Sequence, residues 1–442
     1  MQLPMRRYFY LDIHIFKLII QRGWNIIAGA ITVILIPIWF TGVEQGYYFT
    51  FLSLLALQAF FEMGFSTVIG QFFAHEVAFL KKDGDGFLSG DRRTIKRVQA
   101  LLILVHKWYL TASLLFFIFI GSFGVFFFQR ESGLFTVEWL NIWVFLVFMG
   151  AANLYISPYL AILEAVGYVG EVAQLRLIQT MIGYPIMWIL LTINFGLGVV
   201  VVVPTISAFL GGCFIYKRGI NLRQNFDNRD LGEPIIISWR HEILPMQWKI
   251  ALSWMGGYLA FQAITPIIFM HQGAVEAGRV GLAFSIFNAI SLVGMSWSTA
   301  AMPQMIKLIA HNKRVELINL FDRVLKSSEI FIILILGAFL ITLLALNYFS
   351  ASIVDRLPRF SMLVCMALVA AVNNYIFTAA NFMRAHKQEP MLTLSLVSGL
   401  MILGAIFYAS QYSVGITIAA YTGIIIGISF PWTALLLKNF KK

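Results

Sequence analysis

Long apolar runs constrain this sequence more than any other feature. Twelve stretches of about 20 mostly apolar residues follow one another with short polar connections. Each stretch is long enough for an α-helix to cross the hydrocarbon core of a bilayer. We place the predicted spans at residues 24–41, 47–73, 108–128, 139–163, 174–194, 197–216, 249–270, 279–301, 328–349, 359–383, 390–409 and 412–437.

The composition excludes a water-soluble protein. Hydrophobic residues make up 60% of the 442 residues and charged residues only 12%, whereas soluble chains carry roughly 25% charge. A soluble core of this size would have almost no polar surface to cover it. Cys213 and Cys365 lie in apolar runs and form neither a disulfide framework nor a metal-ligand pattern. We therefore expect an all-α polytopic membrane protein.

The distribution of Lys and Arg predicts how the spans are oriented. If both termini lie on one side, 28 of the 32 Lys and Arg residues fall on that side. The opposite side holds Arg130, Arg279, Arg356 and Arg359. Because positive residues accumulate on the cytoplasmic side, both termini are predicted to be cytoplasmic. This topology also explains the net charge of +11 without nucleic acid as a partner.

Weak internal similarity relates the two halves of the chain. Glu44-Gln45-Gly46 aligns with Glu276-Ala277-Gly278, and Asn153-Leu154-Tyr155 aligns with Asn373-Asn374-Tyr375. A repeat of six spans keeps one orientation, so we expect two six-helix bundles related by a parallel pseudo-two-fold axis, with a cleft between them. The predicted parts are an amphipathic cytoplasmic N-terminus at 1–23, bundles at 24–216 and 249–437, a cytoplasmic linker at 217–248 and a basic tail at 438–442.

Glu62 is the clearest ionisable residue inside a predicted span. A carboxylate at the membrane centre costs about 2.5–3.5 kcal/mol on insertion scales, so it marks either a function or a hydrogen-bond partner. In the first case Glu62 faces the cleft and couples the uptake of a proton or cation to opening. In the second it bonds to a neighbouring hydroxyl or backbone group and holds helices together.

Charged and polar residues at the ends of spans are further candidates. Arg22 and Lys249 begin spans 1 and 7, so a cation on each half could grip a pyrophosphate. Ordinary positive flanking charge is the simpler explanation for either residue alone. Gln71 and His75 end span 2 and form either a cytoplasmic gate or an interfacial cap.

Three amides lie within predicted spans, at Asn153, Asn373 and Asn374. Such groups hydrogen-bond across helices at about 0.6 kcal/mol on average, so they serve either packing or the binding of sugar hydroxyls. Gly423-Ile-Ile-Ile-Gly427 is a GxxxG pattern, which is typical of close helix packing.

No catalytic or cofactor motif is present in the sequence. There is no GxxxxGK[ST] loop for a nucleotide and no HExxH pair for zinc. The seven histidines are scattered, and no nucleophile elbow frames a serine. We therefore expect a protein that is not an enzyme and that binds no cofactor or metal.

Several segments resemble Wzx-type O-antigen flippases. The resemblance implies a twelve-span fold that flips undecaprenyl-pyrophosphate-linked oligosaccharide from the cytoplasmic to the periplasmic leaflet of the bacterial inner membrane. It also implies the polymerase and chain-length proteins of the O-antigen pathway as partners. The segments are Gly23-Trp24-Asn25 through Phe61-Glu62-Met63-Gly64-Phe65, Gln71-Phe72-Phe73-Ala74-His75-Glu76, Gln247-Trp248-Lys249-Ile250-Ala251-Leu252-Ser253-Trp254 and Met302-Pro303-Gln304-Met305, while Leu163-Glu164-Ala165-Val166-Gly167 is similar to a turn of the multidrug/oligosaccharidyl-lipid/polysaccharide exporter superfamily.

Two other functions compete with an ion-coupled flippase that works by alternating access. One is a cation-coupled multidrug exporter of the same superfamily. The other is a membrane-embedded glycosyltransferase or O-antigen polymerase, which would be expected to carry a sizeable periplasmic loop. The longest predicted outside loops, 129–138 and 350–358, have only about ten residues, which disfavours that enzyme.

Overall fold

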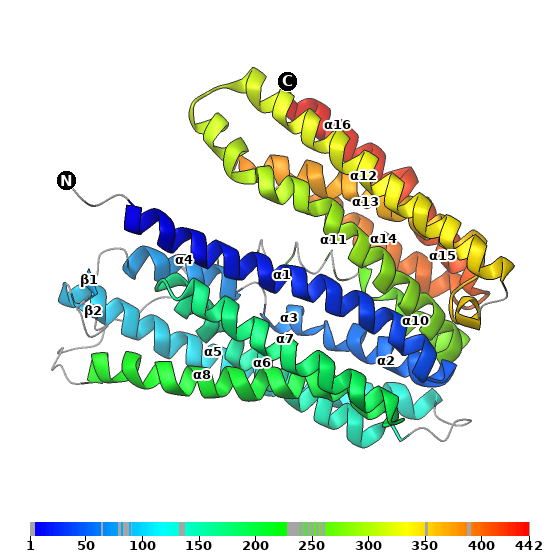
Figure 1. The fold of residues 1–442 in the computed structure, drawn as a ribbon, viewed down its shortest axis with the longest axis horizontal. Coiled ribbons are helices and arrows are strands. Elements are labelled where there is room, and N and C mark those ends of the chain that lie inside the picture. The colour runs from blue at the N-terminus through cyan, green and yellow to red at the C-terminus, as the bar shows by residue number, and fades with distance from the viewer. Residues whose placement is uncertain are drawn as a thin grey trace. The chain divides into compact units, whose positions relative to one another are not determined.

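The computed structural model of the chain is helical almost throughout (Figure 1). Backbone amides in lipid must be satisfied within the segment, so apolar runs of this length fold as helices. The structure describes residues 5–62, 65–77, 81–82, 88–89, 91–131, 138–227, 261–349, 352–386 and 390–441, together with 239, 244, 248, 252, 256 and 258.

The predicted all-α membrane architecture is confirmed. Within the described residues, ten helical segments are long and apolar enough to cross a membrane. Each coincides with one predicted span. The two other predicted spans are the second, which is divided into short helices, and the seventh, whose first half falls in part on residues outside the described ones. The ten spanning helices and the two remaining predicted spans together fit a multi-pass membrane protein with roughly twelve spans.

The chain divides into two compact units. Unit 1 comprises Met1–Thr32 and Leu55–Trp254, and unit 2 comprises Val33–Leu54 and Met255–Lys442. The segment Val33–Leu54 therefore groups with the C-terminal half of the chain, whereas the sequence assigned it to the first bundle.

Unit 1 is built around helix α6, which packs against its neighbours α4, α5 and α8. Leu160, Leu163 and Val172 form one of its buried clusters. Its elements are most of α1 (Met5–Trp39), α3 (Gln58–Glu62), α4 (Phe65–Val77), a short hairpin of β1 (Lys81–Lys82) and β2 (Leu88–Ser89), α5 (Arg92–Glu131), α6 (Leu140–Ala165), α7 (Val169–Thr192), the 3-10 helix η2 (Gly196–Val201) and α8 (Val202–Asp227).

Unit 2 is built around helix α11, which packs along both α12 and α13. Phe321, Phe382 and Met383 form the centre of a buried apolar cluster there. Its elements are α2 (Gly42–Leu55), α10 (Ile264–Gln272), α11 (Ala274–Ala310), α12 (Arg314–Tyr348), the 3-10 helix η4 (Ser352–Arg356), α13 (Phe360–Ala385), α14 (Leu392–Ala409), α15 (Val414–Ile424), the π-helical turn η5 (Ile425–Ser429) and α16 (Phe430–Lys441).

Two predicted boundaries differ from the observed ones. Helix α1 runs unbroken from Met5 to Trp39, so the predicted N-terminal segment and the first span form one helix. The predicted second span 47–73 is interrupted after Leu55. There the carbonyl oxygens of Ala56 and Leu57 accept hydrogen bonds from the amides three residues onward, at 3.2 and 2.9 Å, instead of four residues onward as in an α-helix. This change from α to 3-10 bonding ends α2 and starts α3.

Candidate functional site

Glu62 ends the short helix α3 in unit 1, and its side chain is partly buried. The hydroxyl of Ser66, one turn onward in α4, donates a hydrogen bond to the Glu62 carboxylate. Among the residues that the structure describes, no lysine or arginine forms an ion pair with Glu62. Within the described residues, the Glu62 carboxylate is therefore held by one hydroxyl and has no Lys or Arg ion-pair partner.

The predicted gate residues lie on α4. His75 is exposed in the last turn of that helix, and Gln71 lies one turn earlier. The neighbouring Glu76 forms an ion pair with Arg97 of α5, with Oε1 and Nε 2.9 Å apart. This pair ties the end of α4 to α5.

Of the two cations predicted to bind pyrophosphate, the structure describes only Arg22. Arg22 is exposed on α1 and lies within the candidate span Phe16–Trp39. Lys249 lies outside the described residues. The prediction that both grip one pyrophosphate therefore remains a prediction.

The amide of Asn153 ties two helices of unit 1 together. Its Nδ2 donates to the carbonyl oxygen of Met149 at 2.8 Å, within α6, and to that of Pro204 in α8 at 2.9 Å. Pro204 lies in the first turn of α8, and its carbonyl oxygen is the acceptor of this bond. The Asn153 amide thus joins α6 to α8, and its binding of sugar hydroxyls stays a prediction.

Asn374 is completely buried in unit 2 and joins α13 to α12. Its Nδ2 donates to Ser328 Oγ at 3.1 Å and to Glu329 Oε1 at 2.8 Å. Its Oδ1 has no partner within the described residues and points toward α11, where a Cβ on Gly294 would come within 2.6 Å of it. The neighbouring Asn373 is also buried and lines a small cavity with Tyr421. Asn374 thus joins α13 to α12 beside the half-buried carboxylate of Glu329.

Replacing Asn374 by leucine is expected to destabilise unit 2. The change removes the donor that Glu329 and Ser328 share, and a larger apolar group must fit beside Gly294. Interhelical hydrogen bonds in membranes contribute about 0.6–1.7 kcal/mol, and added crowding increases the loss. A lower thermal unfolding temperature of the purified protein would support this role. Asn439→Leu on the exposed face of α16 is the matched control, and equal effects of the two changes would contradict it.

Small residues bring α2 and α11 together at their N-terminal ends in unit 2. A Cβ added to Gly46 would lie 1.9 Å from the carbonyl oxygen of Ala274, and one added to Gly278 would lie 2.7 Å from the Gly46 amide nitrogen. Gly42 and Gly46 are four residues apart, as are Ala274 and Gly278, so each helix presents two small residues on one face. Gly46 and Gly278 are also equivalent in the predicted repeat. The two helices therefore touch at backbone distance.

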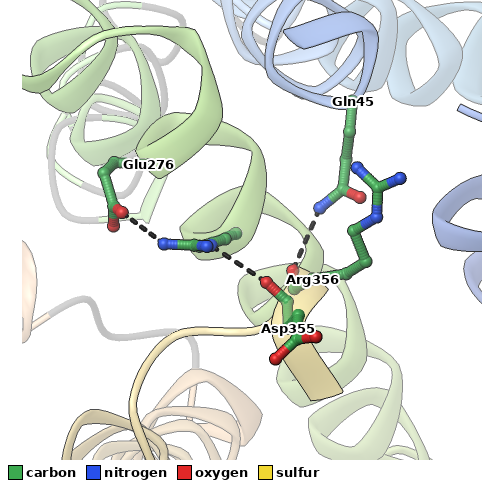
Figure 2. A network of polar contacts seen from close by, with 5 residues as sticks. Gln45, Glu276, Asp355 and Arg356 are labelled. Carbon is green, nitrogen blue, oxygen red and sulfur yellow. Dashed lines mark hydrogen bonds and ion pairs between the residues drawn. The ribbon is translucent and has the colours of Figure 1, made fainter. Parts of the chain in front are cut away.

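A hydrogen-bonded network surrounds this crossing (Figure 2). Gln45 is buried, and its Nε2 donates to the carbonyl oxygens of Gly278 at 2.8 Å and Arg356 at 3.2 Å. Arg279 pairs with Glu276 at 2.5 Å and donates to the Asp355 carbonyl oxygen at 3.0 Å. The network connects α2, α11 and the 3-10 helix η4.

Sequence reasoning overlooked the crossing of α2 and α11 and the Glu329 carboxylate. The crossing could have been predicted, because Gly42-x-x-x-Gly46 and Ala274-x-x-x-Gly278 both have the spacing that suits close helix packing. At Gly423 and Gly427, the pattern singled out instead, no atom of the described residues lies within 4 Å of an added Cβ. The expectation of close packing at Gly423 and Gly427 is therefore wrong. Within the described residues, no group of three or more His, Cys, Asp and Glu side chains could hold a metal ion.

Comparison with solved structures decides the fold. No protein-family model matches this sequence, and no curated protein sequence does. An inward-facing multidrug resistance MATE family transporter of the MOP superfamily aligns over 97% of this chain and 98% of its own, with a TM-score of 0.61 and 15% identity. The lipid II flippase MurJ in an inward closed conformation aligns over 95% of this chain and 87% of its own, with a TM-score of 0.63 and 12% identity.

This chain has the MOP fold. An outward-facing MATE family transporter also aligns, over 96% of this chain, with a TM-score of 0.55 and 14% identity. The MOP fold thus accommodates both a multidrug transporter and a lipid flippase on one helical plan, and at these identities the likeness concerns the fold alone.

Proposed function

We propose that this protein is a flippase that moves a lipid-linked oligosaccharide across the bacterial inner membrane. The observation that carries the proposal is the MOP fold, which is shared along 95% of the chain with a protein described as a lipid II flippase. Its second support is the resemblance of the sequence to Wzx-type proteins. Together these favour undecaprenyl-pyrophosphate-linked O-antigen units as the cargo. The distribution of Lys and Arg favours a cytoplasmic location for both termini of the chain.

The proposed mechanism is alternating access between two six-helix bundles. The pyrophosphate and sugars enter a polar cleft while the lipid tail stays in the bilayer, because only the headgroup is too polar to cross hydrocarbon. Arg22 and Lys249 bind the pyrophosphate from opposite halves, and Asn153, Asn373 and Asn374 provide amides near the sugar path. Gln71 and His75 close the cytoplasmic side, and Glu62 links ion uptake to the change of conformation. The polymerase and chain-length proteins receive the product.

A cation-coupled multidrug exporter is the second candidate, because a multidrug transporter shares the same fold over 97% of this chain. A glycosyltransferase or polymerase is a weaker third candidate, since the aligned structures are described as transporters and a flippase.

Reconstituted transport separates these functions. Proteoliposomes containing the full chain and a fluorescent undecaprenyl-pyrophosphate oligosaccharide are expected to expose the label to an external quencher faster than empty liposomes. Efflux of a cationic dye is expected to remain at the level of empty liposomes. Dye efflux without oligosaccharide movement would overturn the proposal in favour of the drug exporter. Extension of the glycan would indicate an enzyme.

A further inference from the structure

A cavity of about 680 Å³ opens in unit 2 where α10 meets α11 and where α12 and η4 lead into α13. Its volume lies within the range of small-molecule sites, about 300–1,000 Å³. None of the residues assigned a role above as cargo-binding or ion-coupling contributes to it. Its polar lining residues are Gln272, Glu276, Arg279, Asn347, Asp355, Arg359 and Ser413.

The side chains around this cavity balance in charge. Arg279 and Arg359 carry two positive charges, and Glu276 and Asp355 carry two negative ones. Arg279 and Glu276 already neutralise each other at 2.5 Å. A strongly anionic ligand such as a pyrophosphate would need a surplus of positive charge, and this lining has none. The charge balance therefore favours a neutral ligand.

Hydrogen-bonding groups at the cavity remain available to a ligand. Among the described residues, the Arg359 guanidinium, the Asp355 carboxylate and the Asn347 amide have no hydrogen-bond or ion-pair partner, whereas the Gln272 amide donates to the Ser410 carbonyl oxygen at 2.8 Å and keeps its own oxygen as an acceptor. The cavity lining therefore offers both hydrogen-bond donors and hydrogen-bond acceptors. A saccharide suits this lining, because each of its hydroxyls both donates and accepts a hydrogen bond.

Apolar residues form the rest of the lining. Among them, Leu343, Leu357 and Leu363 are buried, and Phe360 is exposed. The C–H face of a sugar ring can pack on such a surface while its hydroxyls meet the polar side. The cavity lining thus combines apolar side chains with hydrogen-bonding groups whose charges balance.

We propose that this cavity binds a neutral saccharide, namely sugars of the translocated oligosaccharide at the end of unit 2 that the charge distribution predicts to face the periplasm. The inference rests on the proposed function for the source of the sugar. A zwitterionic phospholipid headgroup is the competing occupant. Its phosphate and ammonium would use Arg359 and Asp355 but would leave the amides of Gln272 and Asn347 unmatched, so the saccharide is favoured.

Binding to the purified full-length protein tests the proposal by saturation-transfer NMR. The first probe is the neutral glycan released by mild acid from the lipid-linked oligosaccharide pool of the source cells, and the second is dihexanoyl phosphatidylethanolamine. The glycan is expected to bind the native protein. Arg359→Gln and Asn347→Ala are each expected to weaken binding about tenfold, since each removes a hydrogen bond to the sugar.

Arg130→Gln is the matched control, because Arg130 is also predicted to face the periplasm but lies in unit 1 and does not line this cavity. Its glycan affinity should equal that of the native protein, and all variants should share one unfolding temperature. The proposal is overturned if the native protein does not bind the glycan, or if Arg359→Gln and Arg130→Gln behave alike. It is also overturned if the phospholipid, and not the glycan, shows binding that Arg359→Gln abolishes.

The transport assay distinguishes failure of this inference from failure of the proposed function. Oligosaccharide translocation without Arg359-dependent glycan binding would leave the flippase proposal intact and remove the cavity as a sugar site. Arg359-dependent glycan binding without translocation would support the cavity and reject the flippase.

Discussion

Gly46→Ala is expected to lower the thermal unfolding temperature of the purified protein and to reduce oligosaccharide translocation. The new Cβ would lie 1.9 Å from the Ala274 carbonyl oxygen, which belongs to a backbone that cannot turn away like a side chain. Helices α2 and α11 must therefore separate, and the Gln45 amide then loses its bonds to the Gly278 and Arg356 carbonyl oxygens. Overpacking of this kind costs about 1–3 kcal/mol.

The sign of this effect distinguishes the crossing from ordinary helix propensity. In an exposed helix, glycine to alanine stabilises by about 0.5–1 kcal/mol because alanine loses less backbone entropy. Gly23→Ala and Gly423→Ala measure this propensity effect alone, since no atom of the part of the chain that the structure describes lies within 4 Å of an added Cβ at either position. We expect both controls to keep or raise the unfolding temperature. A Gly46→Ala protein as stable as these controls would show that α2 and α11 do not touch in this way.

Glu62→Gln is expected to slow ion-driven translocation by about 5- to 150-fold, the range set by a coupling free energy of about 1–3 kcal/mol. Glutamine has nearly the same shape and still accepts the hydrogen bond from Ser66, but it cannot take up a proton or balance a cation. The packing interpretation therefore predicts little change, whereas the coupling interpretation predicts loss of transport with unchanged stability. Proteoliposomes with an imposed pH or sodium gradient provide the measurement.

Glu316→Gln is the matched control for this substitution. Glu316 is exposed on α12 and pairs with Lys313 at 2.8 Å, with 58% of its side chain accessible. Exposed pairs of this kind contribute about 0–1 kcal/mol, so transport and stability should stay unchanged. Native rates in the Glu62→Gln protein at every gradient would assign Glu62 to packing alone.

The sequence by itself predicted the helical, multi-pass architecture correctly. Lipid offers no hydrogen bonds to the backbone, so about 20 apolar residues in a row become a helix whatever lies beside them. The decision is local, and ten predicted spans accordingly coincide with ten observed helical segments. The interruption after Leu55 escaped this reasoning, because residues 47–73 remain apolar through the turn at Ala56 and Leu57.

Contacts between helices were predicted less well, and the amides illustrate why. Asn374 was recognised as a polar group within a span, but its partners Ser328 and Glu329 are about 45 residues away in sequence. A polar residue within a span predicts only that a hydrogen-bond partner exists. Which partner it is depends on the direction of the side chain in the folded protein.

Glu62 could be singled out from the sequence, whereas the contact made by Gly46 and Gly278 could be found only in the tertiary structure. The sequence alone determined that Glu62 is an ionisable group among apolar residues, since the cost of burying it follows from composition. Only the tertiary structure decided that Gly46 contacts Ala274, while an added Cβ at Gly423 would contact none of the described residues. Lipid and protein are equally apolar to a helix surface, so the hydrophobic effect does not choose the packed face. The fit of side chains and backbones from distant segments chooses it.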